Sequence, residues 1–189
     1  DKDLKWADYA FFSSMVVQQK SARQLIKRCK EAGVKIVAGG PLFTSEHEQF
    51  KDVDHFVLNE AEITLPPFLK DLKNGCAKPV YATPEFADIR ETATPLWNLV
   101  SMSKYASMVI QYTRGCPYQC EFCDVTALFG RRTRTKTTEQ IVAELDTFYN
   151  LGWRGNVFFV DDNLIGNRRS LKNELLPELI KWQENHEAI

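Results

Sequence analysis

Three cysteines lie within eight residues of the segment TRGCPYQCEFCD, residues 113–124: Cys116, Cys120 and Cys123. Thiolates bind soft metal centres, and four of them would complete a zinc site or an ordinary iron–sulfur cluster. Three thiolates on one short loop can hold one face of a four-iron cluster and leave the fourth iron open. The C-x3-C-x2-C spacing therefore favours an iron–sulfur cluster whose open iron binds a substrate or cofactor.

These thiols could also have one of three different roles. They could be buried structural cysteines, although free cysteines rarely gather so closely. They could form a zinc site with a histidine, but His47, His55 and His186 are all distant in sequence. They could hold an electron-transfer cluster with a remote fourth ligand. The remaining cysteines, Cys29 and Cys76, lie far from the loop, and we favour the open-site cluster.

The bulk composition excludes several classes of protein. The chain has 189 residues, 44% of them hydrophobic and 26% charged, which are values of a globular protein. The net charge of −1 gives no attraction to nucleic acid, and no apolar run reaches the roughly 20 residues that span a bilayer. Crowded thiols without a signal segment indicate a reducing compartment, so we expect a cytoplasmic protein.

The elements around the cysteines alternate between strand and helix. A strand over residues 107–113 leads into the cysteine loop, and the next helix starts at a capping box of Thr137 and Gln140. The following strand, NVFFVDDN, ends in Asp161 and Asp162. Ligands of parallel α/β proteins bind at the carboxyl ends of the strands. We therefore expect the cysteines and the aspartates at one edge of a sheet.

The first part of the chain repeats strand and helix three times. Its strands are YAFFSS, VKIVAGGP and HFVLNE, and its first helix has Ser21 and Gln24 in the positions of a capping box. This order predicts a parallel α/β domain over residues 1–75. Three prolines interrupt residues 76–104, which we expect to be a linker. Residues 105–189 form the second α/β region.

The cysteine segment RGCPYQCEFCD resembles the signature of the radical S-adenosylmethionine (SAM) superfamily, C-x3-C-x-aromatic-C. The resemblance implies that Cys116, Cys120 and Cys123 hold a [4Fe–4S] cluster, that SAM chelates its open iron, and that Phe122 lies beside the adenine of SAM. It implies reductive cleavage of SAM to methionine and a hydrogen-abstracting 5′-deoxyadenosyl radical, with an electron donor such as flavodoxin or ferredoxin. The matching region, residues 105–189, corresponds to the first βα units of the family's partial (β/α) barrel.

In similar radical SAM proteins the end of the second strand meets the ammonium group of SAM. We therefore expect at least one of Asp161 and Asp162 to contact SAM, with Asn163 a weaker candidate. A turn or helix cap is the alternative for these residues. The basic run over residues 131–136 could meet the SAM carboxylate or another anion, but such blocks are usually solvated loops, and we favour a loop.

The first region resembles the later part of the cobalamin-binding domain that precedes the radical SAM barrel in one large subfamily. The implied architecture is the C-terminal part of a doubly wound domain followed by the start of the barrel, so we expect the chain to be a piece of a longer protein. The resemblance implies cobalamin contacts by residues at the strand ends: Ser13, Ser14, Gly39, Gly40, Glu60 and Glu62. Ordinary turns and a helix entry are the alternative for these positions.

The combined resemblance implies cobalamin-dependent methylation of an unactivated carbon on a small-molecule or lipid-like substrate. One alternative is a radical SAM oxidoreductase or rearrangement enzyme that transfers no methyl group. A second alternative, from another class, is a non-catalytic iron–sulfur module for electron transfer. We expect catalysis to require the whole protein, because the later barrel strands usually hold the substrate.

Overall fold

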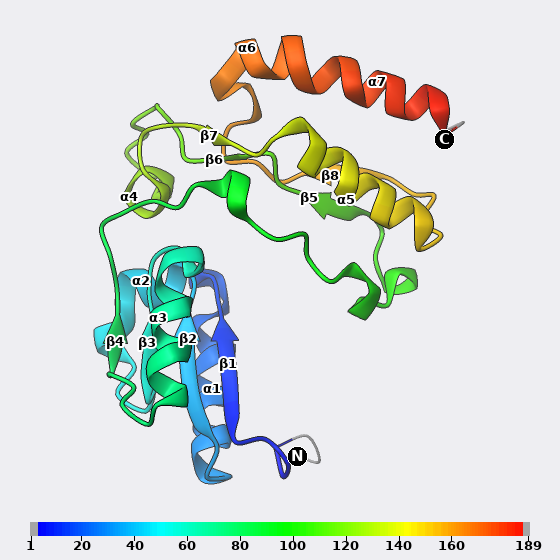
Figure 1. The fold of residues 1–189 in the computed structure, drawn as a ribbon. Helices are drawn as coiled ribbons and strands as arrows, with labels where there is room; N and C mark the ends of the chain where they lie inside the picture. The colour runs from blue at the N-terminus through cyan, green and yellow to red at the C-terminus, as the bar shows by residue number, and fades with distance from the viewer. Residues whose placement is uncertain (1–3, 187–189) are drawn as a thin grey trace. The chain divides into compact units, whose positions relative to one another are not determined.

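The computed structural model describes residues 4–186. The chain forms two compact units, Asp1–Ala87 and Asp88–Ile189. Each unit contains a parallel sheet with helices packed against it (Figure 1). The predicted α/β class is therefore confirmed.

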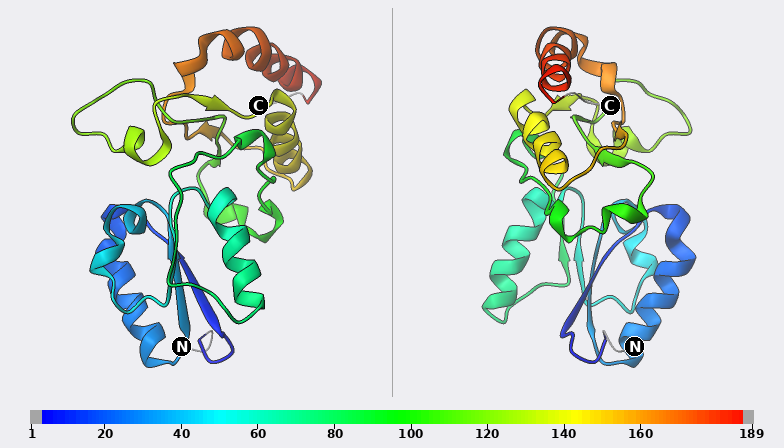
Figure 2. Two further views of the ribbon diagram at one scale, coloured as in Figure 1. Left: turned by 60° about the vertical axis from the view of Figure 1, so that its left-hand side comes forward. Right: turned by 90° about the vertical axis from the view of Figure 1, so that its right-hand side faces the viewer.

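The first unit is a four-stranded parallel sheet with helices on both faces (Figure 2). Its strands, in spatial order, are β1 (Tyr9–Ser13), β2 (Lys35–Gly39), β3 (His55–Val57) and β4 (Val80–Tyr81). Its helices are α1 (Gln19–Glu31), α2 (Pro41–Glu46) and α3 (Ala61–Lys73). Strand residues alternate between faces, so Ile36 and Ala38 share a core with α1 and α2, while Val37 packs with Phe68 of α3.

The first helix begins earlier than the sequence predicts. A 3-10 turn, Val16–Gln18, leads directly into α1 at Gln19, and the Gln18 side chain accepts a hydrogen bond of 2.9 Å from the amide of Met15. The predicted cap at Ser21 is wrong because Ser21 lies inside the helix. The local capping pattern was overridden by a turn that already extended the helix toward β1.

The second unit contains two parallel strands, β5 (Met108–Ile110) and β8 (Val157–Phe159), and a short antiparallel pair, β6 (Thr113–Arg114) and β7 (Arg134–Thr135). Its helices are α4 (Val125–Phe129), α5 (Thr138–Asn150), α6 (Arg168–Ser170) and α7 (Leu176–Asn185). The capping box of α5 is confirmed: Thr137 Oγ1 accepts from the Gln140 amide at 3.2 Å, and Gln140 Oε1 accepts from the Thr137 amide at 2.9 Å.

The core of the second unit lies between β5 and α5. Ile110 of β5 is 1% exposed and shares its cluster with Ile141 and Phe148, which project from one side of α5. A π-helical turn, Leu171–Leu175, precedes α7, and Pro177 lies in the first turn of that helix. Proline has no amide hydrogen to donate, so it is tolerated in the first turn of a helix, where that amide would have no partner within the helix.

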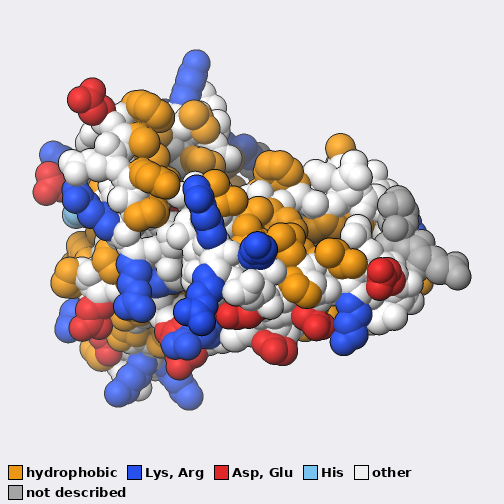
Figure 3. Space-filling view, turned by 90° about the horizontal axis from the view of Figure 1, so that it is seen from above, with side chains coloured by type: hydrophobic (Ala, Val, Ile, Leu, Met, Phe, Trp, Pro, Cys, Tyr) orange, Lys and Arg blue, Asp and Glu red, His pale blue; other side chains and the backbone are white. Residues whose placement is uncertain are grey.

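Residues 76–104, predicted as a linker, contribute β4 to the first sheet and then form three 3-10 turns: Ile89–Glu91, Trp97–Leu99 and Met102–Lys104. Among residues 4–186, no helix is both long and apolar enough to span a membrane. On the face drawn in Figure 3, Lys and Arg side chains lie among acidic and hydrophobic ones.

Candidate functional site

The cysteine loop connects β6 to α4, beyond the carboxyl end of β5. Its start is held by a 3.2 Å hydrogen bond from the Cys116 amide to the Gly130 carbonyl oxygen, and a turn joins the Cys123 amide to the Cys120 carbonyl oxygen at 3.1 Å. All three cysteines are free thiols; Cys120 is exposed, and Cys116 and Cys123 are partly buried. The loop is therefore anchored at its base while its middle reaches solvent.

The residue before the first cysteine must be glycine. Gly115 has a φ of +86°, in the left-handed region that other residues rarely adopt. A Cβ atom there would lie 2.6 Å from the carbonyl oxygen of Arg132 and 2.8 Å from that of Phe129. The close approach of these carbonyls leaves no space for a side chain, so Gly115 fixes where the loop enters the site.

Both aspartates at the end of β8 accept hydrogen bonds from the chain that leads into the cysteine loop. Asp161 Oδ1 accepts from the amide of Tyr112 at 3.0 Å and from the amide of Thr113, and Asp162 Oδ2 accepts from the amide of Gly115 at 3.0 Å. Burial raises the pKa of Asp161 more than the hydrogen bonds from Thr113 and Tyr112 lower it. Asp161 Oδ2 is buried and makes no hydrogen bond.

These bonds also explain a difference from the predicted strand over residues 107–113. The pairing of β5 with β8 stops at Ile110, and the Asp161 side chain then bonds the next amides. Beyond Tyr112, β6 pairs with β7. One predicted strand is therefore two short ones.

The other expected SAM residues lie at the same loop. Asn163 Nδ2 donates to Cys116 Sγ across 3.6 Å. Phe122 is 91% exposed, so its ring is available for contact with a planar group. The structure thus gathers Asp161, Asp162 and Asn163 against the first part of the loop, whereas Phe122 lies free of the packed core.

The basic run is not a uniformly solvated loop. Lys136 is buried and pairs with Glu144 of α5 at 2.5 Å, and its amide donates to the Tyr112 carbonyl oxygen at 2.8 Å. The Arg134 guanidinium donates to the carbonyl oxygen of Phe129 at 3.0 Å. Sequence reasoning missed Glu144, although its place beside Leu145 on the apolar side of the helix was a usable signal for a buried, paired carboxylate.

The donor set of the loop fits an iron–sulfur cluster. Three free thiols in one turn-forming loop are the ligands that such clusters take, and Cys116 Sγ already accepts a hydrogen bond of the kind that tunes cluster sulfur. Within residues 4–186, however, no three Cys, His, Asp or Glu side chains are gathered closely enough to bind a metal ion. The loop thus supplies the ligands but does not hold them in a ligating arrangement.

At the edge of the first sheet, protein atoms occupy the space that a side chain at either glycine would need. Gly40 has a φ of +82°, and a Cβ on it would lie 2.7 Å from Ser13 Oγ. A Cβ on Gly39 would overlap the carbonyl oxygen of Val57. Ser14 is buried, and its carbonyl oxygen accepts from the Leu42 amide at 2.9 Å. Close packing between strand ends is enough to explain these small residues.

The two glutamates of this edge differ. Glu60 is 3% exposed, and its carboxylate accepts from the Ala87 amide at 2.5 Å. Glu62 is exposed in the first turn of α3, where a negative charge favours the helix dipole. Protein contacts therefore account for Glu60, and helix electrostatics is enough to account for Glu62.

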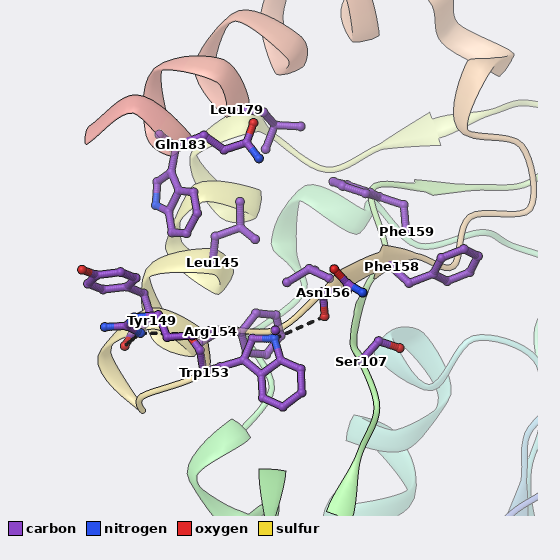
Figure 4. Close-up of a pocket in the computed structure, with 14 residues that line it drawn as sticks. Ser107, Leu145, Tyr149, Trp153, Arg154, Asn156, Phe158, Phe159, Leu179 and Gln183 are labelled. Carbon is purple, nitrogen blue, oxygen red and sulfur yellow. Dashed lines mark hydrogen bonds between the residues drawn. The ribbon is translucent and has the colours of Figure 1, made fainter. Parts of the chain in front are cut away.

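A cavity of about 600 Å³ lies elsewhere in the second unit (Figure 4). Ser107, Asn156 and Val157 line it, so it is at the amino ends of β5 and β8, whereas the cysteines follow the carboxyl ends. Trp153 and Arg154 form its wall, with the Trp153 Nε1 group donating to the Asn156 carbonyl oxygen at 3.2 Å. None of the residues that line this cavity belongs to the cysteine site.

Residues 110–180 match the family model of the Radical SAM superfamily. The matched segment includes the three cysteines and the end of β8, and this part of the chain belongs to that superfamily of enzymes. Membership implies a [4Fe–4S] cluster and SAM as cofactors.

Two curated relatives match almost the whole chain. An uncharacterized methyltransferase of Synechocystis sp. is 43% identical over an alignment of 189 positions that covers 99% of this chain and 35% of the relative. The hopanoid C-2 methylase of Rhodopseudomonas palustris is 37% identical over 186 residues, covering 96% of this chain and 35% of the relative. The chain therefore spans about a third of the length of these relatives.

Two solved structures share the fold. The radical SAM methyltransferase TsrM of Kitasatospora setae, with tryptophan substrate and a SAM analogue bound, has a TM-score of 0.71 and 15% identity, covering 94% of this chain and 40% of that one. The cobalamin-dependent radical SAM enzyme OxsB, with aqua-cobalamin bound, has a TM-score of 0.67 and 22% identity, covering 95% of this chain and 28% of that one.

Proposed function

We propose that the whole protein is a radical SAM methyltransferase that methylates an unactivated carbon with the help of cobalamin. The observation that carries the proposal is the cysteine loop beyond the carboxyl end of β5, hydrogen-bonded to the end of β8 through Asp161, Asp162 and Asn163. Carboxyl ends of parallel strands are where such folds bind ligands. The family match and the methyltransferase relatives support the same conclusion.

Each residue of the loop has a proposed task. Cys116, Cys120 and Cys123 would hold the [4Fe–4S] cluster, and the exposed Phe122 would lie against the adenine of SAM. Asp161 and Asp162 border the loop as acceptors of backbone amides, and their expected contact with the ammonium group of SAM, which would need a charged carboxylate, stays a prediction. When bound and reduced, for example by a flavodoxin or ferredoxin, the cluster supplies the electron for cleavage of SAM to methionine and a 5′-deoxyadenosyl radical.

Cobalamin is proposed for the whole protein on the strength of the relatives. OxsB binds cobalamin and shares the fold, and the hopanoid relative is a methylase. In the first unit, by contrast, Gly39, Gly40 and Glu60 have protein partners that explain them. The proposal therefore takes no support from those side chains, and the substrate is left as a small molecule or lipid.

Anaerobic reconstitution of the full-length protein tests the enzyme class. We expect about four irons per chain, an EPR signal of the reduced cluster that SAM perturbs, and 5′-deoxyadenosine on reduction. Cys120→Ala should lose the cluster, whereas Cys76→Ala, which removes an exposed cysteine outside the loop, should keep it. A cluster indifferent to SAM would identify an electron-transfer module instead. The visible spectrum of the same protein tests cobalamin: no corrinoid retained under saturating conditions excludes cobalamin-dependent methylation.

A further inference from the structure

The backbone pairing between β5 and β8 stops before the chain reaches the cysteine loop. Ile110 pairs with Phe159, and the Val160 amide donates to the Ile110 carbonyl oxygen at 2.9 Å. Beyond that bond, β6 pairs with β7 instead. The amides that follow on the β5 side therefore need other acceptors, because a buried N–H group without a partner is costly.

Asp161 supplies the first of these acceptors. Its Oδ1 atom accepts from the amides of both Tyr112 and Thr113, residues that are 1% and 0% exposed. Water has no access to these amides, so their protection depends on this one oxygen. The Asp161 side chain thus does for these two amides what further backbone pairing would do in a longer ladder.

The next two residues continue the same pattern. Asp162 Oδ2 accepts from the Gly115 amide at 3.0 Å, and Asn163 Nδ2 donates to Cys116 Sγ at 3.6 Å. The partners advance in the same order along both segments, as they would in a parallel ladder, but side chains replace the backbone of one strand. The contacts end on the first cysteine of the loop.

We infer that Asp161, Asp162 and Asn163 are positioning residues that hold the segment from Tyr112 to Cys116 and thereby set the place of the first cluster thiol. The two carboxylates act here as hydrogen-bond acceptors for backbone amides, so their shape is required and their charge is not. The inference deepens the proposed function and rests on it only for the identity of the cluster. Direct contact of either carboxylate with the SAM ammonium is the competing role, because that role requires the charge.

Paired substitutions separate the two roles. Asp161→Ala and Asp162→Ala remove the acceptor, whereas Asp161→Asn and Asp162→Asn remove the charge and keep an oxygen in place. Amide hydrogen exchange is measured by NMR on the protein without its cluster. We expect the amides of Tyr112 and Thr113 to exchange at least about tenfold faster in Asp161→Ala, and both to return close to wild type in Asp161→Asn.

The same logic applies to Asp162 and Gly115. We expect Asp162→Ala to accelerate exchange of the Gly115 amide by about tenfold and Asp162→Asn to restore it. Asp124→Ala is the matched control, because Asp124 is exposed in the same loop and its side chain caps no amide. That control should leave the Tyr112 and Gly115 amides unchanged.

Two results would overturn the inference. One is fast exchange of the Tyr112, Thr113 and Gly115 amides in the wild-type protein, a result that needs no variant and so holds even if an alanine variant fails to fold. The other is unchanged exchange in the alanine variants while the amides of Ile141 and Leu145 in α5 report an intact core.

Activity measurements separate this failure from failure of the proposed function. In the reconstituted full-length protein, positioning predicts that the Asn variants retain iron and bind SAM within about threefold of wild type, whereas contact with the SAM ammonium predicts weaker SAM binding in both Asn and Ala variants. Protected amides in a protein that never cleaves SAM would reject the proposed function and keep the positioning role.

Discussion

The two units end their parallel strands in similar residue types but use them differently. At the edge of the first sheet, Gly40 packs against Ser13, and the Glu60 carboxylate bonds an amide of its own unit. At the edge of the second, Asp161 and Asp162 bond the amides that lead into a loop in which Cys120 and the Phe122 ring are exposed. Protein contacts fill the first edge, whereas the second edge anchors the loop that carries the cysteines and Phe122.

This difference teaches that a polar or small residue at a strand end does not by itself identify a ligand contact. Both edges follow the rule that ligands of α/β folds lie beyond the carboxyl ends of the strands. The two edges differ in the segment that the strand-end side chains contact. In the second unit the side chains bond a neighbouring loop that carries three cysteines, the residue type that binds iron–sulfur clusters.

The buried ion pair between Lys136 and Glu144, near the second edge, gives the prediction with the largest expected effect. The side chains of Lys136 and Glu144 are 9% and 3% exposed, and the Lys136 amide bonds Tyr112 directly below the loop. Lys136→Met leaves the Glu144 carboxylate buried without its cation and should lower the free energy of unfolding by about 3–5 kcal/mol. Urea denaturation followed by tryptophan fluorescence would measure the loss.

A double variant is the control for this prediction. Lys136→Met with Glu144→Leu removes both charges and should recover most of the stability, because the buried pair is costly to break but not to replace. A single variant within about 1 kcal/mol of wild type would show that the second edge does not depend on the pair.

Substitutions at three glycines with positive φ test how tightly each edge is packed and should have the next largest effect. A Cβ on Gly115 would meet backbone carbonyl oxygens, a Cβ on Gly40 would meet mainly the Ser13 hydroxyl, and a Cβ on Gly33 would meet nothing within 4 Å. Gly115→Ala should cost about 3 kcal/mol, from backbone strain plus crowding, and Gly33→Ala about 1 kcal/mol, from strain alone. Thermal unfolding of the three variants would rank them.

We expect Gly40→Ala to fall between the other two, because a hydroxyl can rotate away and a carbonyl cannot. Equal losses for Gly33→Ala and Gly115→Ala would mean that the loop entrance yields to a methyl group, and the second edge would then be less rigid than its contacts indicate.

The sequence was a good guide wherever one local pattern decides the structure. The Thr137 capping box follows from neighbours within a few residues, and the strand–helix order of the first region predicts its parallel sheet. The cap predicted at Ser21 failed because the chain entering the helix already forms a turn, and local propensity is weaker than that connection.

In the candidate site, too, local patterns could be predicted, whereas contacts between distant segments could not. Spacing alone identified Cys116, Cys120 and Cys123 as one group. It could not identify the partners of Asp161, because those amides lie 48 and 49 residues away and meet it only through the register of β5 against β8. Lys136 was assigned to a solvated loop for a similar reason: its partner Glu144 is on another element.

The smallest expected effect concerns a carboxylate that bonds a backbone amide on the surface, unlike Asp161 or Glu60. Asp88 Oδ1 accepts from the Arg90 amide at 3.1 Å, and the Arg90 guanidinium bonds the same carboxylate. Hydrogen bonds from the Arg90 side chain and then its backbone, with the positive charge, lower the pKa of Asp88 from 3.8 to about 2. Because the pKa is lower in the folded state, the pair stabilises the protein above pH 3.8 and loses this contribution as the pH falls through 2.

Asp88→Asn should therefore lower Tm slightly at about pH 6 and much less near pH 2, where part of the folded-state carboxylate is protonated. Added salt should shrink the difference at the higher pH because the carboxylate is 41% exposed. Asparagine can still accept from the Arg90 amide, so the variant isolates the charge from the cap. Thermal unfolding across this pH range measures both. A loss at the higher pH as large as that of Lys136→Met would contradict the comparison, because it would mean that burial does not decide how much a carboxylate's partner contributes.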